Sequence, residues 1–290
     1  MLGQAVYDRV QQNGVEILAS DIDVNEPWLE YADIRDRTQI GDHVKRFQPH
    51  LIINLAAMTD LEICERNPED AWNTNAIGAE NLGVLANALK VPYVYISTAG
   101  IFDGQQAVYT DNDTPLPLSV YGKSKFQGEH FVRQFVPLHL ILRAGWMMGG
   151  GPRKDKKFIN KLYKQIIAGS RHLRVVDDKL GTPTYTVDFA NGMVKLIEGD
   201  NFGLYNQVCS GTASRYDVAL EFVSLLGLSS VIEVEKVASD YFRDEYFAPR
   251  PASEQLVNSR LTDKGLNFMR DWRVCLAEYA AQFPADVQTT

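Results

Sequence analysis

The sequence predicts an α/β protein in which a parallel, doubly wound sheet is covered by helices on both faces and is followed by a smaller α/β lobe. Strand and helix patterns alternate between residues 15 and 142, and this order is typical of parallel sheets. The length of 290 residues allows one large domain or two smaller ones. Past residue 146 the alternation weakens and the segment GGGPRKDKK interrupts it, so we expect the second lobe to form largely from the later third.

The first elements follow from short apolar patterns. A helix starts at Gln4 and ends at the turn Asn13-Gly14. Residues 15–20 are a short apolar run, which we interpret as a buried strand with Asp21 at its carboxyl end. A helix followed by a strand that ends in an acid is typical of the second half of a dinucleotide-binding unit. Because the first half is not in the sequence, we expect the natural chain to begin roughly a dozen residues upstream.

The later elements continue the alternation. Pro68 and Pro92 bracket the longest predicted helix. The expected helices lie at 36–47, 68–89, 119–135, 157–168 and 188–198, with two amphipathic ones in RYDVALEFVSLL and VCLAEYAAQF. The expected strands lie at 50–57, 92–98 and 138–142, followed by the strand-like segments LRVV and GLYNQVC.

Composition excludes several classes of partner. The chain has 29 basic and 37 acidic residues, a net charge of -8, whereas nucleic-acid binding needs a basic face. No apolar run approaches the roughly 18 residues of a membrane span, so we expect no membrane partner and a cytoplasmic location. Cys64, Cys209 and Cys275 are widely spaced and lack CxxC pairs, which indicates reduced, buried thiols and no metal site.

The segment VYGKSK carries the strongest chemical signal. Tyr121 and Lys125 are four residues apart on a predicted helix and therefore share a face. A lysine cation nearby favours the phenolate and lowers the pKa of the phenol, which makes a general acid and base. Ser97 and Thr98 end the preceding strand, where a hydroxyl can bind a carbonyl oxygen. A half-buried tyrosine beside a surface lysine is the structural alternative, but the order of strand, hydroxyl pair and helix favours catalysis.

Several motifs in the same order resemble the dTDP-4-dehydrorhamnose reductase family of extended short-chain dehydrogenases/reductases, over essentially the whole chain. The matching segments are INLAAMTDLEICERNPEDAWNTNAIGAENL, YISTAGIFDG, LPLSVYGKSKFQGE, LILRAGWM, LRVVDDKLGTPTYTVDFA and APRPASEQLVNSRL. The resemblance implies a Rossmann-type dinucleotide-binding domain at 1–146, to which 184–208 returns. It also implies a substrate-binding lobe made of 147–183 and 209–290.

The resemblance further implies that NADH or NADPH delivers hydride to C4 of a nucleotide-linked 4-keto-6-deoxy sugar. Tyr121 would protonate the developing alkoxide, Thr98 would polarise the carbonyl, and Lys125 would lower the Tyr121 pKa and hold the nicotinamide ribose. The further cofactor contacts would be Leu2, Gly3, Asp21, Asp33, Ile34, Leu55, Ala56 and Ala57. An acid at 21 with no arginine directly after it favours NADH, although Arg35 and Arg37 could lie near in space.

On the substrate side, the resemblance places Thr59 and Trp146 beside the sugar and Thr184 and Arg250 on the nucleotide side. Core packing is the alternative for Trp146, and a surface position is the alternative for Arg250. The basic residues Arg153, Lys154, Lys156 and Lys157 are interpreted as a solvated loop, with diphosphate contact as the second interpretation.

Two departures from the family pattern concern the sugar. Ala99-Gly100 stands where the family has Asp-Tyr, and Ala144-Gly145 stands where it has Thr-Ser. A smaller and less polar pocket could accept another 4-keto sugar. The loss of the acid after Thr98 argues against dehydration, whereas epimerisation at C4 stays open.

A non-catalytic role is the second hypothesis, because the resemblance extends to the regulatory subunit of methionine adenosyltransferase. That subunit keeps the fold and binds a partner. Retention of Thr98, Tyr121 and Lys125 argues for the enzyme, since a binding protein needs no activated phenol. The expected partner is a nucleotide-sugar substrate, and a homodimer is the assembly left open.

Overall fold

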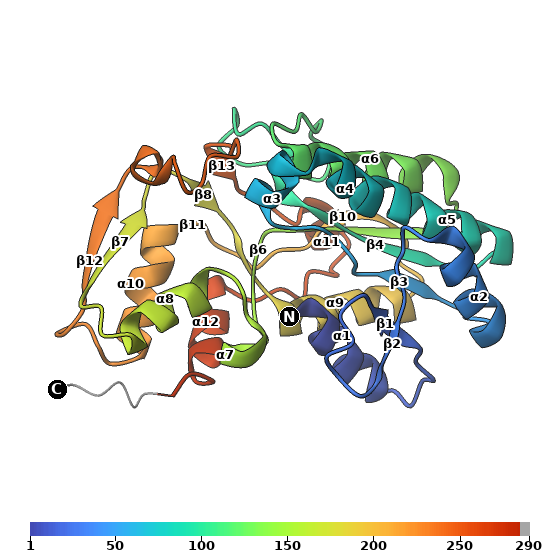
Figure 1. Ribbon diagram of the computed structural model, residues 1–290, viewed down its shortest axis with the longest axis horizontal. Coiled ribbons are helices and arrows are strands. Elements are labelled where there is room, and N and C mark those ends of the chain that lie inside the picture. Colours follow the sequence, from blue (N-terminus) through green and yellow to red (C-terminus); the bar gives the residue numbers. More distant parts are fainter. Residues whose placement is uncertain (285–290) are drawn as a thin grey trace.

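Four parallel strands form the central sheet of the larger lobe, in the spatial order β10-β5-β4-β3. The computed structural model describes residues 1–284, and its two lobes lie side by side along the long axis (Figure 1). The pairing of β4 with β5 runs from Tyr93 opposite His139 to Thr98 opposite Ala144. The carboxyl ends of these strands therefore share one edge, which is where open α/β sheets bind ligands. The strands are β3 (Ile52–Asn54), β4 (Tyr93–Thr98), β5 (His139–Ala144) and β10 (Gly203–Asn206).

Helices cover both faces of this sheet, as the alternation predicts (Figure 1). On one face, Tyr93, Tyr95 and Ile141 pack with Val132 in a closed apolar cluster. On the other face, the first helix packs against α9 near the amino terminus. The helices of this lobe are α1 (Leu2–Gln11), α2 (Arg37–Phe47), α3 (Leu61–Arg66), α4 (Pro68–Trp72), α5 (Gly78–Leu89), α6 (Val120–Phe135), α9 (Thr186–Glu198) and the 3₁₀ turn η2 (Ala99–Ile101).

The helix predicted at 68–89 contains a π-helical turn. Helix α4 leads directly into η1 (Asn73–Ile77), which leads directly into α5. A π turn has one more residue per hydrogen-bonded ring than an α turn, and such turns often mark functional sites. The apolar pattern of the sequence predicts the helix but does not reveal this turn.

The prediction of a buried strand at 15–20 is wrong in position and in environment. The strand β1 (Ala19–Asp21) pairs in parallel with β2 (Leu29–Tyr31) as a separate two-stranded sheet. Val15 is 53% exposed. The prediction assumed a central strand with both faces covered, but β1 is bonded only to β2, and β3 only to β4, in the residues described.

The smaller lobe is built from short strands around a helical core (Figure 1). The strands β6 and β9 pair in parallel. Because β6 directly follows β5 of the central sheet, the chain passes from the larger lobe to the smaller one at this pair. The strands are β6 (Trp146–Met148), β7 (His172–Val176), β8 (Leu180–Gly181), β9 (Pro183–Tyr185), β11 (Ala213–Ser214), β12 (Glu233–Val237) and β13 (Ser253–Glu254). The helices are α7 (Gly151–Lys154), α8 (Phe158–Ile167), α10 (Arg215–Leu225), η3 (Ser239–Phe242), α11 (Ser259–Asp263) and α12 (Trp272–Ala280).

One apolar core runs through both lobes. It joins Val94 and Leu140 of the central sheet to Phe222 and Trp272 of the smaller lobe. The lobes are therefore packed on one another. The two lobe boundaries predicted from the sequence stay a prediction, although β10 does lie in the central sheet beside β5.

The three cysteines are free, buried thiols. Cys209 and Cys275 lie close together, with their sulfur atoms 3.7 Å apart. In the described part of the chain, no helix combines the length and apolar character that crossing a bilayer requires.

Candidate active site

Tyr121 and Thr98 meet at the carboxyl edge of the central sheet. Tyr121 lies in the first turn of α6, which Ser119 caps by accepting a hydrogen bond from Gly122 N at 3.1 Å. Helix α6 approaches η2 so closely that a Cβ placed on Gly122 would lie 2.2 Å from the carbonyl oxygen of Gly100. Only glycine permits this approach. It brings Tyr121 close to Thr98, because a Cβ placed on Gly100 would lie 3.5 Å from both Tyr121 Cε1 and Thr98 Oγ1.

The two hydroxyl residues at the end of β4 point to opposite faces, as strand geometry requires. Thr98 faces the site, and its Oγ1 accepts a hydrogen bond from Gly100 N at 3.1 Å. Ser97 is buried and donates to Glu129 Oε2 at 2.7 Å. Only Thr98 is therefore available to a substrate, whereas Ser97 supports the buried ion pair between Glu129 and Arg143, in which Nη2 and Oε1 are 2.6 Å apart.

Lys125 is one turn after Tyr121 and is only 3% exposed. Its Nζ lies 4.2 Å from the ring centroid of Tyr95. Among residues 1–284, Nζ has no hydrogen bond or ion pair. Burial lowers the pKa of Lys125 to about 7, against a smaller opposing effect of Glu129.

The expectation that Lys125 lowers the pKa of Tyr121 is wrong for the free protein. Burial raises the pKa of Tyr121 to about 12, and the contact with Thr98 offsets only part of that rise. Desolvation disfavours the charged form of each residue, so it raises the pKa of the phenol and lowers that of the amine. The phenol of Tyr121 therefore holds its proton, and it is ready to act as an acid.

The π turn η1 supplies a supporting residue that sequence reasoning missed. The amide of Asn75 donates to Ser124 Oγ at 3.0 Å and to the Met58 carbonyl at 3.0 Å. Tyr95 donates to the Lys125 carbonyl at 2.9 Å. These bonds fix α6 against the loop after β3, and the position of Asn75 inside a helical pattern gave no signal of this role.

The predicted phosphate and ribose contacts are open to a ligand. Gly3 is exposed in the first turn of α1, where a Cβ would meet nothing within 4 Å. Leu2 beside it packs partly against the core. Asp21 is exposed at the end of β1, and its carboxylate accepts the Asp23 N–H at 3.0 Å.

The predicted adenine contacts are engaged with neighbouring residues. Asp33 binds Arg35, with Nη2 and Oδ2 2.7 Å apart, and this contact lowers the pKa of Asp33. Ile34 packs on α5, because a Cβ on Gly78 would lie 2.4 Å from Ile34 Cδ1. Both residues lie between β2 and α2 in the chain.

The predicted wall beside the cofactor follows β3. Ala56 is exposed, and its N–H donates to Asn54 Oδ1 at 3.0 Å. Leu55 and Ala57 are partly buried on either side of it. The hydrogen bond from Ala56 to the Asn54 side chain thus fixes this segment, while Ala56 itself faces outward.

Thr59 contacts the smaller lobe. Lys157 Nζ donates to Thr59 Oγ1 at 3.0 Å, and burial lowers the pKa of Lys157. Two other members of the basic cluster, Arg153 and Lys154, pair with Glu26. The cluster is therefore partly engaged with neighbouring residues and is not a wholly solvated loop.

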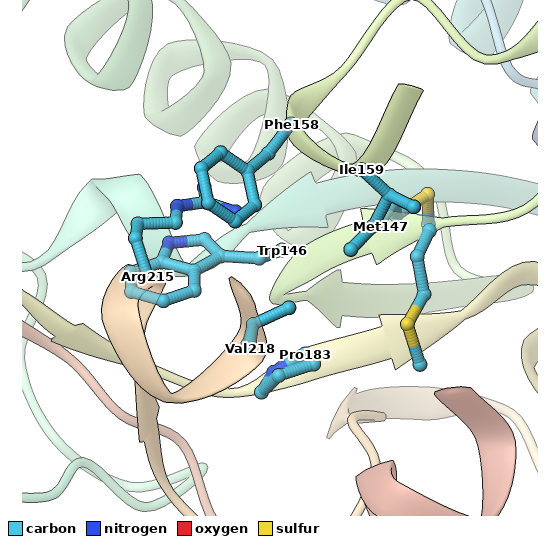
Figure 2. A pocket seen from close by; sticks show the side chains of 8 residues that line it. Trp146, Met147, Phe158, Ile159, Pro183, Arg215 and Val218 are labelled. Carbon is cyan, nitrogen blue, oxygen red and sulfur yellow. The ribbon is translucent and has the colours of Figure 1, made fainter. Parts of the chain in front are cut away.

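Trp146 lies on the wall of a small pocket that β6, α8, β9 and α10 of the smaller lobe enclose (Figure 2). The guanidinium carbon of Arg215 is 3.8 Å from the Trp146 ring and 5.0 Å from the Phe158 ring. The indole Nε1 donates to Glu254 Oε2 at 2.7 Å. Sequence reasoning assigned no role to Arg215 or Glu254. The segment of Arg215 predicted only a helix, and the segment of Glu254 contributed only to the family resemblance.

Two predicted nucleotide contacts are used within the protein. Thr184 is fully buried, and its hydroxyl accepts from Gly145 N at 3.2 Å and donates to the Thr182 carbonyl at 3.3 Å. Its contact with the nucleotide stays a prediction. Arg250 binds Glu62 through two nitrogens, at 2.7 and 3.0 Å. It joins the lobes and is not a free surface arginine, and its predicted contact with the nucleotide also stays a prediction.

The comparison of this chain with known proteins shows its family. The model of the RmlD substrate binding domain matches residues 1–284. The chain belongs to this family. It is 31% identical over 279 residues to the spore coat polysaccharide biosynthesis protein SpsK of Bacillus subtilis, covering 96% of this chain and 93% of that protein.

Two further members of the RmlD family have names that describe an activity. A dTDP-4-dehydrorhamnose reductase of Mycolicibacterium smegmatis is 30% identical over 97% of this chain and 82% of its own length. The crystal structure of a dTDP-4-dehydrorhamnose reductase of Clostridium acetobutylicum superposes with a TM-score of 0.88 at 31% identity, covering 97% of this chain and 95% of that one. The beta subunit of methionine adenosyltransferase 2 of Danio rerio is 26% identical over 92% of this chain and 83% of that protein.

Proposed function

We propose that this chain reduces the 4-keto group of a nucleotide-linked 6-deoxy sugar, with dTDP-4-keto-6-deoxy-L-mannose as the substrate to test first. The observation that carries the proposal is the contact between Tyr121 and Thr98, with the buried ammonium of Lys125 one helical turn away. These groups are an acid, a carbonyl-binding hydroxyl and a cation, arranged at the edge where open α/β sheets bind ligands.

The proton moves from Tyr121 to the substrate. When hydride adds to C4, negative charge develops on the C4 oxygen, and the Tyr121 phenol gives that oxygen its proton. The raised pKa of Tyr121 keeps the phenol protonated until then. Thr98 Oγ1 is positioned by its bond from Gly100 N, and its hydroxyl proton, which faces Tyr121 in the free protein, turns to the same substrate oxygen when the sugar is bound.

Lys125 fits a nicotinamide cofactor. The Lys125 amine has no hydrogen-bond partner in residues 1–284, and its protonated form is costly to bury unless a ligand supplies one. Ribose hydroxyls are suitable acceptors for its three N–H groups, and the open first turn of α1 suits a pyrophosphate. The cofactor supplies the hydride when it is bound, while Lys125 holds the ribose and stabilises the phenolate left on Tyr121.

We propose NADH as the preferred form of the cofactor. The exposed carboxylate of Asp21 favours ribose hydroxyls and repels a 2'-phosphate. Arg35, which could offset this repulsion, is bound to Asp33. A relative from Bacillus anthracis, at 26% identity, has been solved in complex with NADP, so the two forms need direct comparison in this chain.

A regulatory role is the second candidate, because a methionine adenosyltransferase subunit is among the relatives. The assay that separates the two follows the oxidation of NADH and NADPH by the unchanged chain with dTDP-4-keto-6-deoxy-L-mannose. Turnover supports the reductase. Cofactor binding without turnover, together with tight binding to a methionine adenosyltransferase catalytic subunit, would support the regulatory role instead.

A further inference from the structure

Glu254 brings a carboxylate from the smaller lobe to the catalytic residues. It ends β13, where it pairs with Gly181 of β8. A Cβ placed on Gly100 would lie 3.4 Å from Glu254 Oε1, 3.5 Å from Thr98 Oγ1 and 3.5 Å from Tyr121 Cε1. One point in the site is thus in contact distance of the carboxylate, the carbonyl-binding hydroxyl and the catalytic ring.

The carboxylate is held by one oxygen only. Trp146 Nε1 donates to Oε2 at 2.7 Å, and the indole is fixed in turn by Arg215 on its face, 3.8 Å away. A Cβ on Gly181 would lie 2.3 Å from Trp146 Cε2, so the ring is tightly packed. Within residues 1–284, Oε1 accepts no hydrogen bond and Glu254 forms no ion pair within 4 Å, although the buried Arg215 interacts with its charge. The fixed side chain therefore presents a free acceptor.

The segment after β4 explains why this acceptor reaches the site. Ala99 and Gly100 have no polar side-chain atoms, and Gly100 leaves the space that Glu254 faces. The expectation of a less polar pocket, drawn from Ala99-Gly100 alone, therefore needs correction. A charged acceptor enters from residue 254, more than 150 positions away in the chain.

We propose that Glu254 is a specificity-determining residue of the sugar pocket, whose Oε1 accepts a hydrogen bond from a ring hydroxyl next to the keto carbon. The inference rests on the proposed function, because it takes a 4-keto sugar as the ligand. A carboxylate accepts hydrogen bonds and donates none when ionised. The pocket thus selects sugars that carry a hydroxyl next to the keto carbon, and it disfavours sugars that lack this hydroxyl or carry only an acceptor there.

Calorimetric binding of two probes tests the assignment. dTDP-L-rhamnose carries the sugar and dTDP lacks it. We expect Glu254→Gln to bind dTDP-L-rhamnose roughly 10- to 100-fold more weakly than the unchanged chain, the effect of losing a hydrogen bond to a charged group. Binding of dTDP should change less than about twofold. Glu254→Asp, which keeps the charge but withdraws it by one methylene group, should also weaken only the sugar-bearing probe.

The matched control is Glu233→Gln, an exposed glutamate on β12 in the same lobe, which should bind both probes as the unchanged chain does. Equal loss of both probes in Glu254→Gln, no loss of either, or no binding of dTDP-L-rhamnose to the unchanged chain would each overturn the inference. Failure of the proposed function has a different result: the selective loss of dTDP-L-rhamnose binding would persist while no 4-keto sugar nucleotide is reduced.

Discussion

Tyr121 and Thr98 lie side by side where α6 and η2 come closest, each with an atom 3.5 Å from a Cβ placed on Gly100. The contact depends on Gly122, because any side chain there would collide with the Gly100 carbonyl. Acid and carbonyl-binding hydroxyl are therefore positioned by packing of the backbone, before a substrate arrives. Placement of this kind lowers the cost of orienting groups during the reaction.

Replacing Lys125 by methionine should change how stability depends on pH. The pKa of Lys125 is about 7 in the folded chain and near its ordinary value of 10.5 when unfolded. Between these values the unfolded chain binds the extra proton, so the free energy of unfolding rises as pH rises from 7 to 10.5. In Lys125→Met this rise should be smaller by on the order of a few kcal/mol.

Urea unfolding at the two ends of that pH range measures the effect. Methionine keeps an apolar stem against Tyr95 and removes the charge. An identical pH dependence in both proteins would show that Lys125 is not desolvated as the structure indicates.

Removing Glu129 should destabilise the fold strongly. Arg143 is 1% exposed and would keep a buried charge without its carboxylate partner. We expect Glu129→Ala to lose about 3–5 kcal/mol of unfolding free energy. Asp42→Ala, at the exposed pair with Lys45, should lose less than about 1 kcal/mol. Similar losses in the two variants, measured by urea unfolding, would contradict the buried pair.

Replacing Asp21 by serine should shift the choice of cofactor. Loss of the carboxylate removes its repulsion of a 2'-phosphate and its bonds to ribose hydroxyls. We expect the ratio of kcat/KM for NADPH to that for NADH to rise about tenfold. Asp23→Ser, two residues away and also exposed, is the control and should leave the ratio unchanged. If the kcat/KM ratio rose equally in both variants, the prediction that Asp21 binds the ribose would be wrong.

Local patterns predicted much of this molecule. The spacing of Tyr121 and Lys125 on one helix and the place of Thr98 at a strand end follow from periodicity within a few residues, and the structure has all three at the sheet edge. The strand at residues 15–20 was misplaced because a short apolar run does not reveal which neighbours will cover it.

The remaining features depend on contacts between distant segments. Glu254 reaches Trp146 across 108 positions, and Arg250 reaches Glu62 across 188. No local pattern encodes such pairs. The raised pKa of Tyr121 was missed for a related reason, since desolvation depends on everything packed around α6.

The measurement that tests the central claim most directly is the rate of NADH oxidation with dTDP-4-keto-6-deoxy-L-mannose for the unchanged chain, Tyr121→Phe and the exposed control Tyr241→Phe. We predict turnover by the unchanged chain and the control, and a loss of about 10²- to 10⁴-fold in kcat for Tyr121→Phe, with cofactor binding retained. Full activity in Tyr121→Phe would contradict the assignment of Tyr121 as the acid.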